Sequence, residues 1–358
     1  MSFSRQRQTA PRSLIAIGAV VTAAALAVLF GPLAASAETA PKTQIKFATL
    51  APDGSTWMKV MHAVDDEVRS ATENRIGFKF YPGAVQGDEK DVLRKMRNGQ
   101  IHGGGFTGFG LGAIAPEFRV IELPFMFKNL DEVDYVRSEL DSFIYDTFKQ
   151  KGFVFLGWAD VGFVYLFSNS PITTPEELRR AKMWTWSGDL LAEIFFKAFH
   201  VSPIPLALPD VLTSLQMGVI DAVYSPPLAC VALQWFTRVK HMTDVPIAYG
   251  FGAMLVSEEI LRGADPADVE KLKEICRKHS KLLIEKTRSQ DVEAVEAIKR
   301  EGVTVLDVKD DIEREFFATG RGAWKDGVGR LYPDDLLRRV TTMVDAYRAD
   351  PKDAKSNP

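Results

Sequence analysis

The sequence predicts an α/β protein with largely parallel sheets, arranged as two similar lobes. Two observations support this class: strand and helix patterns alternate, and one helix–glycine–strand unit occurs twice. The strands are expected at 44–50, 76–81, 153–158, 163–168, 183–186, 219–224 and 248–256. The helices are expected at 55–72, 88–98, 131–150, 188–199, 209–217, 226–237 and 265–300.

Apolar periodicity justifies the first elements. Apolar and polar residues alternate over 44–50 and 76–81, which is typical of strands with one buried face. Between them, apolar residues recur at helical spacing over 55–72, and Ser55 or Asp53 is available as the N-cap. The later elements follow from the same change of period along the chain.

An internal repeat relates 92–103 to 211–222 at an offset of 119 residues. The matched positions are Val92-Leu93, Met96, Gly99 and Ile101 with Val211-Leu212, Leu215, Gly218 and Ile220. Each copy predicts a helix, a glycine that ends it and a strand that leads into a loop, at 104–110 and 225–228. Open α/β sheets bind ligands at the carboxyl ends of their strands, so we expect the two loops to face each other across a cleft.

The first residues have the order of a secretory signal peptide. Arg5, Arg7 and Arg12 precede an uncharged, largely apolar run over 14–30, and Ala35-Ser36-Ala37 provides a small-residue exit. Cleavage is expected after Ala37, which places the mature protein in the periplasm. The alternative is an uncleaved N-terminal anchor, because the apolar run is just short of a comfortable membrane span.

Charge and cysteine content exclude several classes. The formal net charge is −3 and becomes −6 without the first 37 residues, and the remaining chain has no basic runs, which argues against nucleic acid as a partner. Cys230 and Cys276 are too few for a disulfide scaffold or a cysteine-built zinc site. We expect two buried thiols, with a single bridge as the alternative.

A search for catalytic motifs favours binding over catalysis. The five histidines are scattered, and no HExxH, P-loop, GxSxG or paired-cysteine pattern occurs. Residues 103–108 satisfy GxGxxG, with Glu122 near the acidic position of a dinucleotide site. A short preceding strand and export away from NAD favour a structural role for these glycines. We therefore expect no cofactor, no metal and no enzymatic activity.

Aromatic residues are the positive signal for a binding site. Trp184 and Trp186 lie on one face of a predicted strand, and Tyr224 ends another. Such side chains combine large contact area with a polar group, so we favour pocket positions for Trp184 and Tyr224. Trp158 suits the core and the pocket equally.

Several longer stretches match a known family. They are Lys46-Phe47-Ala48, Tyr81-Pro82-Gly83, Leu123-Pro124-Phe125, the SNSPITTPEEL run at 168–178 and the LQMGVIDA run at 215–222. Through them the mature chain resembles, over nearly its whole length, the extracytoplasmic solute-binding subunits of tripartite ATP-independent periplasmic (TRAP) transporters, the dicarboxylate-binding type.

The resemblance implies a Venus-flytrap fold, in which two α/β lobes joined by a hinge and a long bridging helix close around a ligand. The lobes would comprise 43–161 with 250–288, and 162–249 with 289–349. The resemblance also implies delivery of a small molecule to two integral membrane subunits, small and large, with uptake driven by an ion gradient. We expect the protein to be a monomer. The remaining tail, 350–358, is short, polar and bounded by proline, so we expect it to be disordered.

Departures from the family pattern bear on the ligand. Two arginines that family members use for organic acids are replaced by Trp184 and Val164, and a common asparagine by Ser225. An arginine fork is the natural receptor for a carboxylate, so a simple carboxylate is not the expected ligand unless Arg119, Arg179 or Arg180 reaches the cleft. The residues expected to bind are Asp53, Phe106, Thr107, Trp158, Val164, Trp184, Trp186, Asp189, Tyr224 and Ser225.

Two other functions remain open from the sequence. A sensory protein that presents its ligand to a membrane receptor would share all of these features. A periplasmic enzyme is the weaker alternative, because no activated nucleophile or metal cluster is visible.

Overall fold

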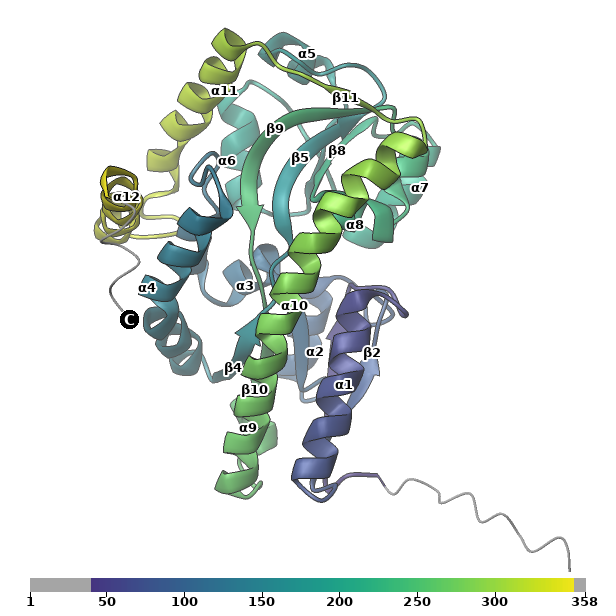
Figure 1. The fold of residues 1–358 in the computed structure, drawn as a ribbon, viewed down its shortest axis with the longest axis vertical. Helices are drawn as coiled ribbons and strands as arrows, with labels where there is room; N and C mark the ends of the chain where they lie inside the picture. The colour runs from purple at the N-terminus through teal and green to yellow at the C-terminus, as the bar shows by residue number, and fades with distance from the viewer. Residues whose placement is uncertain (1–39, 351–358) are drawn as a thin grey trace, which may run out of the picture. The chain divides into compact units, whose positions relative to one another are not determined.

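The computed structural model of the protein describes residues 40–350. The predicted signal peptide, and the predicted tail apart from Asp350, lie outside the described residues. The described chain is a mixed α/β protein with two larger sheets and a short two-stranded ribbon (Figure 1). None of its helices is both long enough and apolar enough to cross a membrane.

The first sheet has the strand order β2-β1-β3-β10-β4. These strands are β1 (Thr43–Thr49), β2 (Ile76–Tyr81), β3 (Gly103–Thr107), β4 (Phe153–Trp158) and β10 (Gly252–Ser257). β1 pairs in parallel with β2 and β3, whereas β10 is antiparallel to both β3 and β4. The expectation of largely parallel sheets is wrong, because β10 returns from the second sheet and inserts in the opposite direction.

The second sheet has the strand order β11-β9-β5-β8. Its strands are β5 (Gly162–Ser168), β8 (Ala222–Ser225), β9 (His241–Gly250) and β11 (Thr304–Leu306), and the separate ribbon pairs β6 (Trp184–Trp186) with β7 (Ile204–Leu206). β5 is antiparallel to β8 and β9. The single strand expected at 248–256 is therefore two strands in different sheets, a change that an unbroken apolar run cannot reveal.

The chain crosses between the two sheets at two places, and these two crossing segments lie side by side. One is 159–161, between β4 and β5, and the other is Phe251, between β9 and β10. The N–H of Ala159 donates to the carbonyl of Gly252 (2.8 Å), and the N–H of Val161 donates to the carbonyl of Gly250 (3.0 Å). A Cβ on Gly252 would lie 2.3 Å from the Ala159 carbonyl oxygen, so glycine is required for the two crossings to approach this closely.

Helices surround both sheets (Figure 1). Those packed mainly around the first sheet are α1 (Thr56–Ala71), α2 (Glu89–Arg97), α3 (Gly108–Ile114), α4 (Leu130–Gln150), α9 (Glu258–Leu261) and α12 (Asp334–Ala349). The others are α5 (Pro175–Arg180), α6 (Leu190–Ala198), α7 (Val211–Gln216), α8 (Pro227–Ala232), α10 (Pro266–Arg300) and α11 (Asp310–Gly322). Short 3₁₀ turns are η1 (Pro116–Glu122), η2 (Leu208–Asp210), η3 (Trp235–Arg238) and η4 (Ala323–Gly327).

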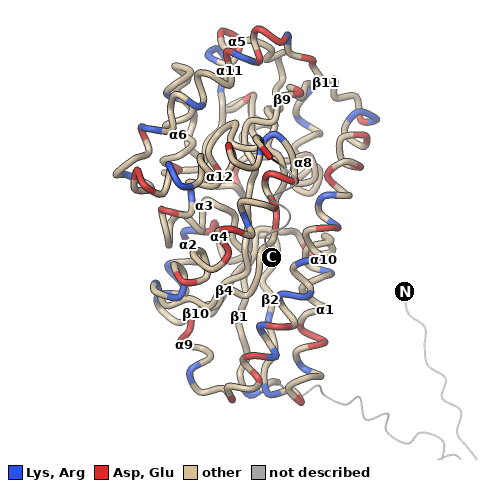
Figure 2. The backbone as a smooth tube through the Cα atoms, turned by 60° about the vertical axis from the view of Figure 1, so that its left-hand side comes forward, with Lys and Arg blue, Asp and Glu red and all other residues tan. Residues whose placement is uncertain are grey.

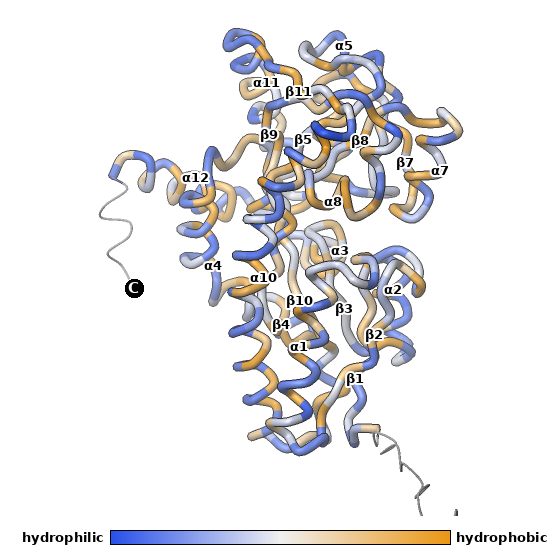
Figure 3. The backbone as a smooth tube through the Cα atoms, turned by 45° about the vertical axis from the view of Figure 1, so that its right-hand side comes forward, coloured by the Kyte–Doolittle hydropathy of each residue, from blue (hydrophilic) through white to orange (hydrophobic). Residues whose placement is uncertain are grey.

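The long helix α10 packs on elements of both sheets. Leu272 and Cys276 of its first half share a core with α1 and the first sheet, whereas Ile298 near its end lies in a core of the second sheet. Charged residues recur along the whole length of α10, with hydrophobic residues between them (Figures 2 and 3). The two thiols, Cys230 and Cys276, are free and buried in different cores, so the prediction of two buried thiols is confirmed.

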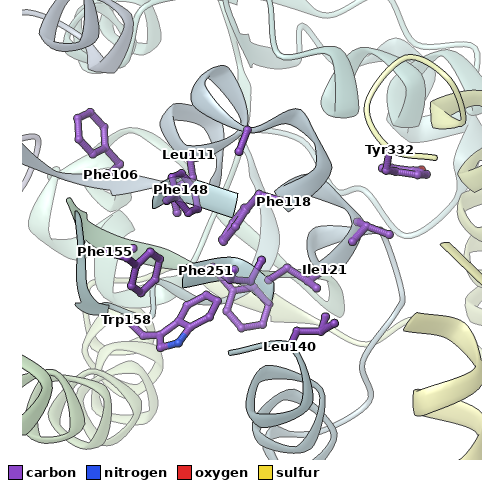
Figure 4. Packing of buried hydrophobic residues seen from close by; sticks show 14 of the residues in the cluster. Phe106, Leu111, Phe118, Ile121, Leu140, Phe148, Phe155, Trp158, Phe251 and Tyr332 are labelled. Atoms are coloured by element: carbon purple, nitrogen blue, oxygen red, sulfur yellow. The ribbon is translucent and has the colours of Figure 1, made fainter. Parts of the chain in front are cut away.

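An aromatic core holds the first sheet, α4 and η1 together (Figure 4). Trp158 contacts Phe118, Phe155 and Phe251, with ring centroids 5.1–6.0 Å apart. Its indole N–H donates to the Asp141 carboxylate (2.7 Å). Full burial of each such ring contributes about 1.5–3 kcal/mol, so Trp158 has a structural role here.

The internal repeat is present in the structure and is longer than the sequence match. α2, β3 and α3 form the first copy, and α7, β8 and α8 form the second. β3 and α3 begin at Gly103 and Gly108, and β8 and α8 begin at Ala222 and Pro227, which preserves the offset of 119. The helix-ending glycines, Gly99 and Gly218, have φ values of 65° and 69°.

Candidate ligand-binding cavity

A cavity of about 510 Å³ is lined jointly by residues of both sheets and of the crossings between them. Residues 105–109 at the end of β3 and 224–226 at the end of β8 both line it, so the expected meeting of the two repeat copies at one site is confirmed. Neither segment is the loop that was expected, at 104–110 and at 225–228, because β8 continues to Ser225 and α8 begins at Pro227. β3 continues to Thr107, whose side chain caps α3 by accepting from the N–H of Phe109.

The glycines of the GxGxxG match make room for side chains of this chain. A Cβ on Gly105 would lie 2.4 Å from the Trp57 ring, and one on Gly108 would lie 1.8 Å from a Glu122 carboxylate oxygen. The space that a dinucleotide pyrophosphate would need is therefore filled by Trp57 and Glu122. These positions support the structural role expected for the glycines.

Trp184 forms a fixed aromatic wall of the cavity. Its ring stacks on Tyr224 (centroids 5.0 Å apart, 23° between planes) and meets the edge of Trp235 at 5.3 Å. Its indole N–H donates to the carbonyl of Leu206 (3.2 Å), and the residue is only 1% exposed. Contacts on several sides hold this ring in one orientation.

Trp186 connects the ribbon to the first repeat copy. Its ring stacks on Phe109 of α3 (5.1 Å, 14°), and its indole N–H donates to the carboxylate of Asp88 (3.1 Å). Asp88 caps α2 and also accepts from the backbone N–H of Leu208 (3.2 Å). Burial raises the pKa of Asp88, whereas the hydrogen bonds from the N–H of Glu89, the N–H of Leu208 and the indole of Trp186 oppose the rise.

Arg119 brings a buried charge to the cavity. Its Nη2 donates to Asp189 (3.1 Å), and its Nε lies 3.2 Å from a Glu122 oxygen. Asp189 also caps α6 by accepting from the N–H of Leu191, and Glu122 accepts from the N–H of Phe251 (2.9 Å). Burial raises the pKa of Glu122 to about 7, although the Arg119 guanidinium opposes the rise.

Two further acidic side chains line the cavity, and both are already bonded. Glu89 accepts from the N–H and the hydroxyl of Thr107 and from the N–H of Gly110, while burial raises its pKa to about 8. Asp160 accepts from Tyr249, Arg137 and Arg288. Among residues 40–350 no group of three or more His, Cys, Asp or Glu side chains is placed to hold a metal ion.

The structure brings most of the sequence-predicted site residues together. Those that line the cavity are Phe106, Thr107, Val164, Trp184, Trp186, Asp189, Tyr224 and Ser225. Trp158 does not, because it is packed in the aromatic core. Asp53 is exposed beside the cavity and its carboxylate accepts from the N–H of Gly54. Binding roles for all ten residues remain predictions.

Of the three arginines that could have reached the cleft, Arg119 does so. Arg179 is exposed and donates to the carbonyl of Phe199, and Arg180 is also exposed. Glu89 was not predicted at the cavity, and Glu122 was considered only as the acidic residue of a dinucleotide site. A signal for Glu122 was present in the sequence, because Arg119 and Glu122 are two charged residues inside the otherwise apolar run 118–127. Charged side chains in such a run are expected to be buried and paired.

Comparisons with known proteins agree with this architecture. The model of the family "Bacterial extracellular solute-binding protein, family 7" matches residues 47–328. A solute-binding protein of Verminephrobacter eiseniae is 26% identical over 67% of this chain and 72% of its own length. The C4-dicarboxylate-binding periplasmic protein DctP of Rhodobacter capsulatus is 25% identical over 90% of this chain and 94% of its own.

A solved structure shows the same fold. A TRAP periplasmic solute-binding protein of Xanthobacter autotrophicus, with β-D-galacturonate bound, superposes with a TM-score of 0.78. The match covers 84% of this chain and 99% of the other at 19% identity.

Proposed function

Because the chain belongs to the family of bacterial extracellular solute-binding proteins, family 7, we propose that it is the receptor of a TRAP-type uptake transporter driven by an ion gradient. The family and its structural neighbours are solute-binding proteins and not enzymes. The observation that carries the proposal is a cavity that residues of both sheets line together. Two adjacent chain crossings join these sheets. In this role the receptor closes on a ligand and presents it to a small and a large membrane subunit.

The proposed receptor has two lobes around the crossings. The first comprises 43–161, 250–288 and α12 (Asp334–Ala349), and the second comprises 162–249 and 289–333. We assign α12 to the first lobe in place of the second, because Leu337 and Val340 pack in the same core as Val136 and Leu140 of α4. Export to the periplasm with cleavage after Ala37 belongs to the same proposal.

The proposed ligand is a small molecule that is not a simple carboxylate. Trp184 occupies the position at which the family resemblance implies a carboxylate-binding arginine, and its ring is fixed by Tyr224 and Trp235. Arg119 does line the cavity, but two carboxylates already contact its guanidinium. The relatives that bind a C4-dicarboxylate or galacturonate therefore do not set the ligand class of this chain.

A thermal-shift screen of the mature protein, beginning at Glu38, tests the proposal. One library holds small organic acids, and the other holds neutral, aromatic and amine compounds. A ligand that binds only the folded state stabilises it by about 2.7 kcal/mol at a hundredfold excess over Kd. We expect hits in the second library. Hits confined to simple carboxylates would contradict the proposed ligand class and leave the receptor role in place.

A blocked cavity supplies the control for specific binding. Ala229 of α8 lines the cavity, so Ala229→Phe fills part of it and should abolish the shift. Ala267→Phe places the same side chain at an exposed position of α10 and should leave the shift unchanged. Hits that persist in Ala229→Phe would show that the ligand binds elsewhere.

A further inference from the structure

The charges that line the cavity are already balanced by neighbouring groups. Asp160 is held by two arginines and a tyrosine, and Glu89 by three donors. The guanidinium of Arg119 lies between Asp189 and Glu122. A charged ligand would find no unpaired counter-ion among the described residues that line the cavity.

Arg119 nevertheless retains hydrogen-bonding capacity. Nη2 donates to Asp189, whereas Nε lies 3.2 Å from a Glu122 oxygen without forming a hydrogen bond, and no hydrogen bond joins Nη1 to a described residue. Arg119 is 8% exposed and lines the cavity, whose other walls include Trp184, Phe195 and Leu233. A guanidinium N–H can only donate, so the matching ligand atom is an acceptor.

The sign of the local charge limits which acceptor fits. One guanidinium beside two carboxylates gives the cluster a net charge of −1 when both carboxylates are ionised, and zero when Glu122, whose pKa burial raises to about 7, holds its proton. In either state a ligand carboxylate would add a negative charge beside Asp189 in a poorly solvated site, where like charges repel strongly. A ligand ammonium would have to approach the guanidinium itself. An uncharged oxygen meets neither penalty.

On the basis of the proposed receptor function, we propose that Arg119 Nη1 binds one uncharged oxygen, a carbonyl or hydroxyl, of a ligand whose remaining part is apolar. The apolar part packs against the wall formed by Trp184, Phe195 and Leu233. The occupant is thus a neutral ketone, ester, amide or alcohol of mainly hydrocarbon character.

A matched series of probes tests this ligand class. Acetophenone, benzoate, benzylamine and ethylbenzene share one ring and differ in the group that would meet Arg119. In calorimetric titrations at neutral pH, we expect acetophenone to bind the mature protein at least about tenfold more tightly than each of the other three probes. Compared with ethylbenzene, acetophenone can accept one additional hydrogen bond from a charged donor. Preference for benzoate or benzylamine overturns the inference but leaves a working receptor, and ethylbenzene binding as well as acetophenone overturns it too. No binding by any probe, where the library screen has found ligands, also overturns it.

The variant Asp189→Asn tests whether local charge sets the preference. Asparagine still caps α6 but removes one negative charge beside Arg119. We expect the affinity for benzoate relative to acetophenone to rise about tenfold, equivalent to one contact of 1.4 kcal/mol. Asp265→Asn makes the same change at the exposed N-cap of α10 and should leave the ratio unaltered. An unchanged ratio in Asp189→Asn overturns the inference.

Discussion

The two copies of the helix–glycine–strand–helix unit share a backbone but differ in what they bring to the cavity. At equivalent places the first copy has Gly103 and Gly105 and the second has Ala222 and Tyr224. In the first copy the glycines admit atoms from distant segments, such as the Trp57 ring. In the second copy Tyr224 supplies its own ring to the cavity wall.

This difference separates two kinds of information in the sequence. The repeated spacing determines where each helix ends and where each strand begins, since Gly99 and Gly218 both adopt left-handed backbone. The chemistry of the cavity comes from long-range neighbours, which the repeat does not encode. Substitutions that exchange the two copies at matched positions should therefore have unequal effects.

The largest effect is expected at the first strand position. Gly103→Ala would place a Cβ 2.6 Å from the carbonyl oxygen of Leu255 in the adjacent strand, so we expect it to lower the free energy of unfolding by about 3 kcal/mol. The reverse exchange, Ala222→Gly, removes a buried methyl from an existing strand and should cost about 1 kcal/mol. Urea denaturation measures both. Equal losses would show that β3 and β8 are equally crowded, contrary to the structure.

Much of the fold was predictable from local patterns. Strands β2 and β4 and helices such as α4 and α10 were predicted to within one residue at each end, because their apolar period and flanking caps are local. The antiparallel insertion of β10 was not, since it depends on pairing between residues far apart in sequence. The elements β11, α11 and α12 were not predicted individually.

The site divides in the same way. Trp184, Trp186 and Tyr224 could be placed at the cavity because aromatic residues at strand ends are a local signal. The Glu122 contact with Arg119 and the contacts of Glu89 with Thr107 and Gly110 arise only once η1, α2 and α3 meet. Trp158 shows the limit of the local signal, because a tryptophan at a strand end can also face the core.

Acidic residues that enter the cavity beside the first copy should make stability depend on pH. Burial raises the pKa of Glu122 to about 7, so its folded state holds a proton that the unfolded chain has released above pH 4.5. The contribution of Glu122 to the free energy of unfolding is therefore most favourable below pH 4.5. It falls by on the order of 2–3 kcal/mol as the pH rises towards 7. Glu89, with its pKa raised to about 8, extends the fall in the same direction.

Glu122→Gln should remove part of this dependence. Thermal unfolding between pH 5 and pH 8.5 should show a shallower decline of Tm in Glu122→Gln than in the parent protein, because only Glu89 still titrates there among these two residues. Glu315→Gln, an exposed change on α11, serves as the control and should follow the parent profile. A parent Tm that rises over this interval would contradict the raised pKa values.

The smallest effect is expected at the residue that distinguishes the second copy. The buried hydroxyl of Tyr224 lies near the Thr185 side chain and the Trp186 backbone but forms no hydrogen bond of good geometry in the described part of the chain, whereas the ring stacks on Trp184. Tyr224→Phe keeps the ring and removes the unpaired group, so the free energy of unfolding should change by less than about 0.5 kcal/mol or rise slightly.

The matched control is Tyr332→Phe. The hydroxyl of Tyr332 donates to the carbonyl of Trp324 (2.7 Å), so its removal should lower the free energy of unfolding by about 1 kcal/mol. A loss in Tyr224→Phe as large as that in Tyr332→Phe, measured by urea denaturation, would mean that the hydroxyl has a partner in solution. The second copy would then contribute a bonded polar group to the cavity as well as an aromatic ring.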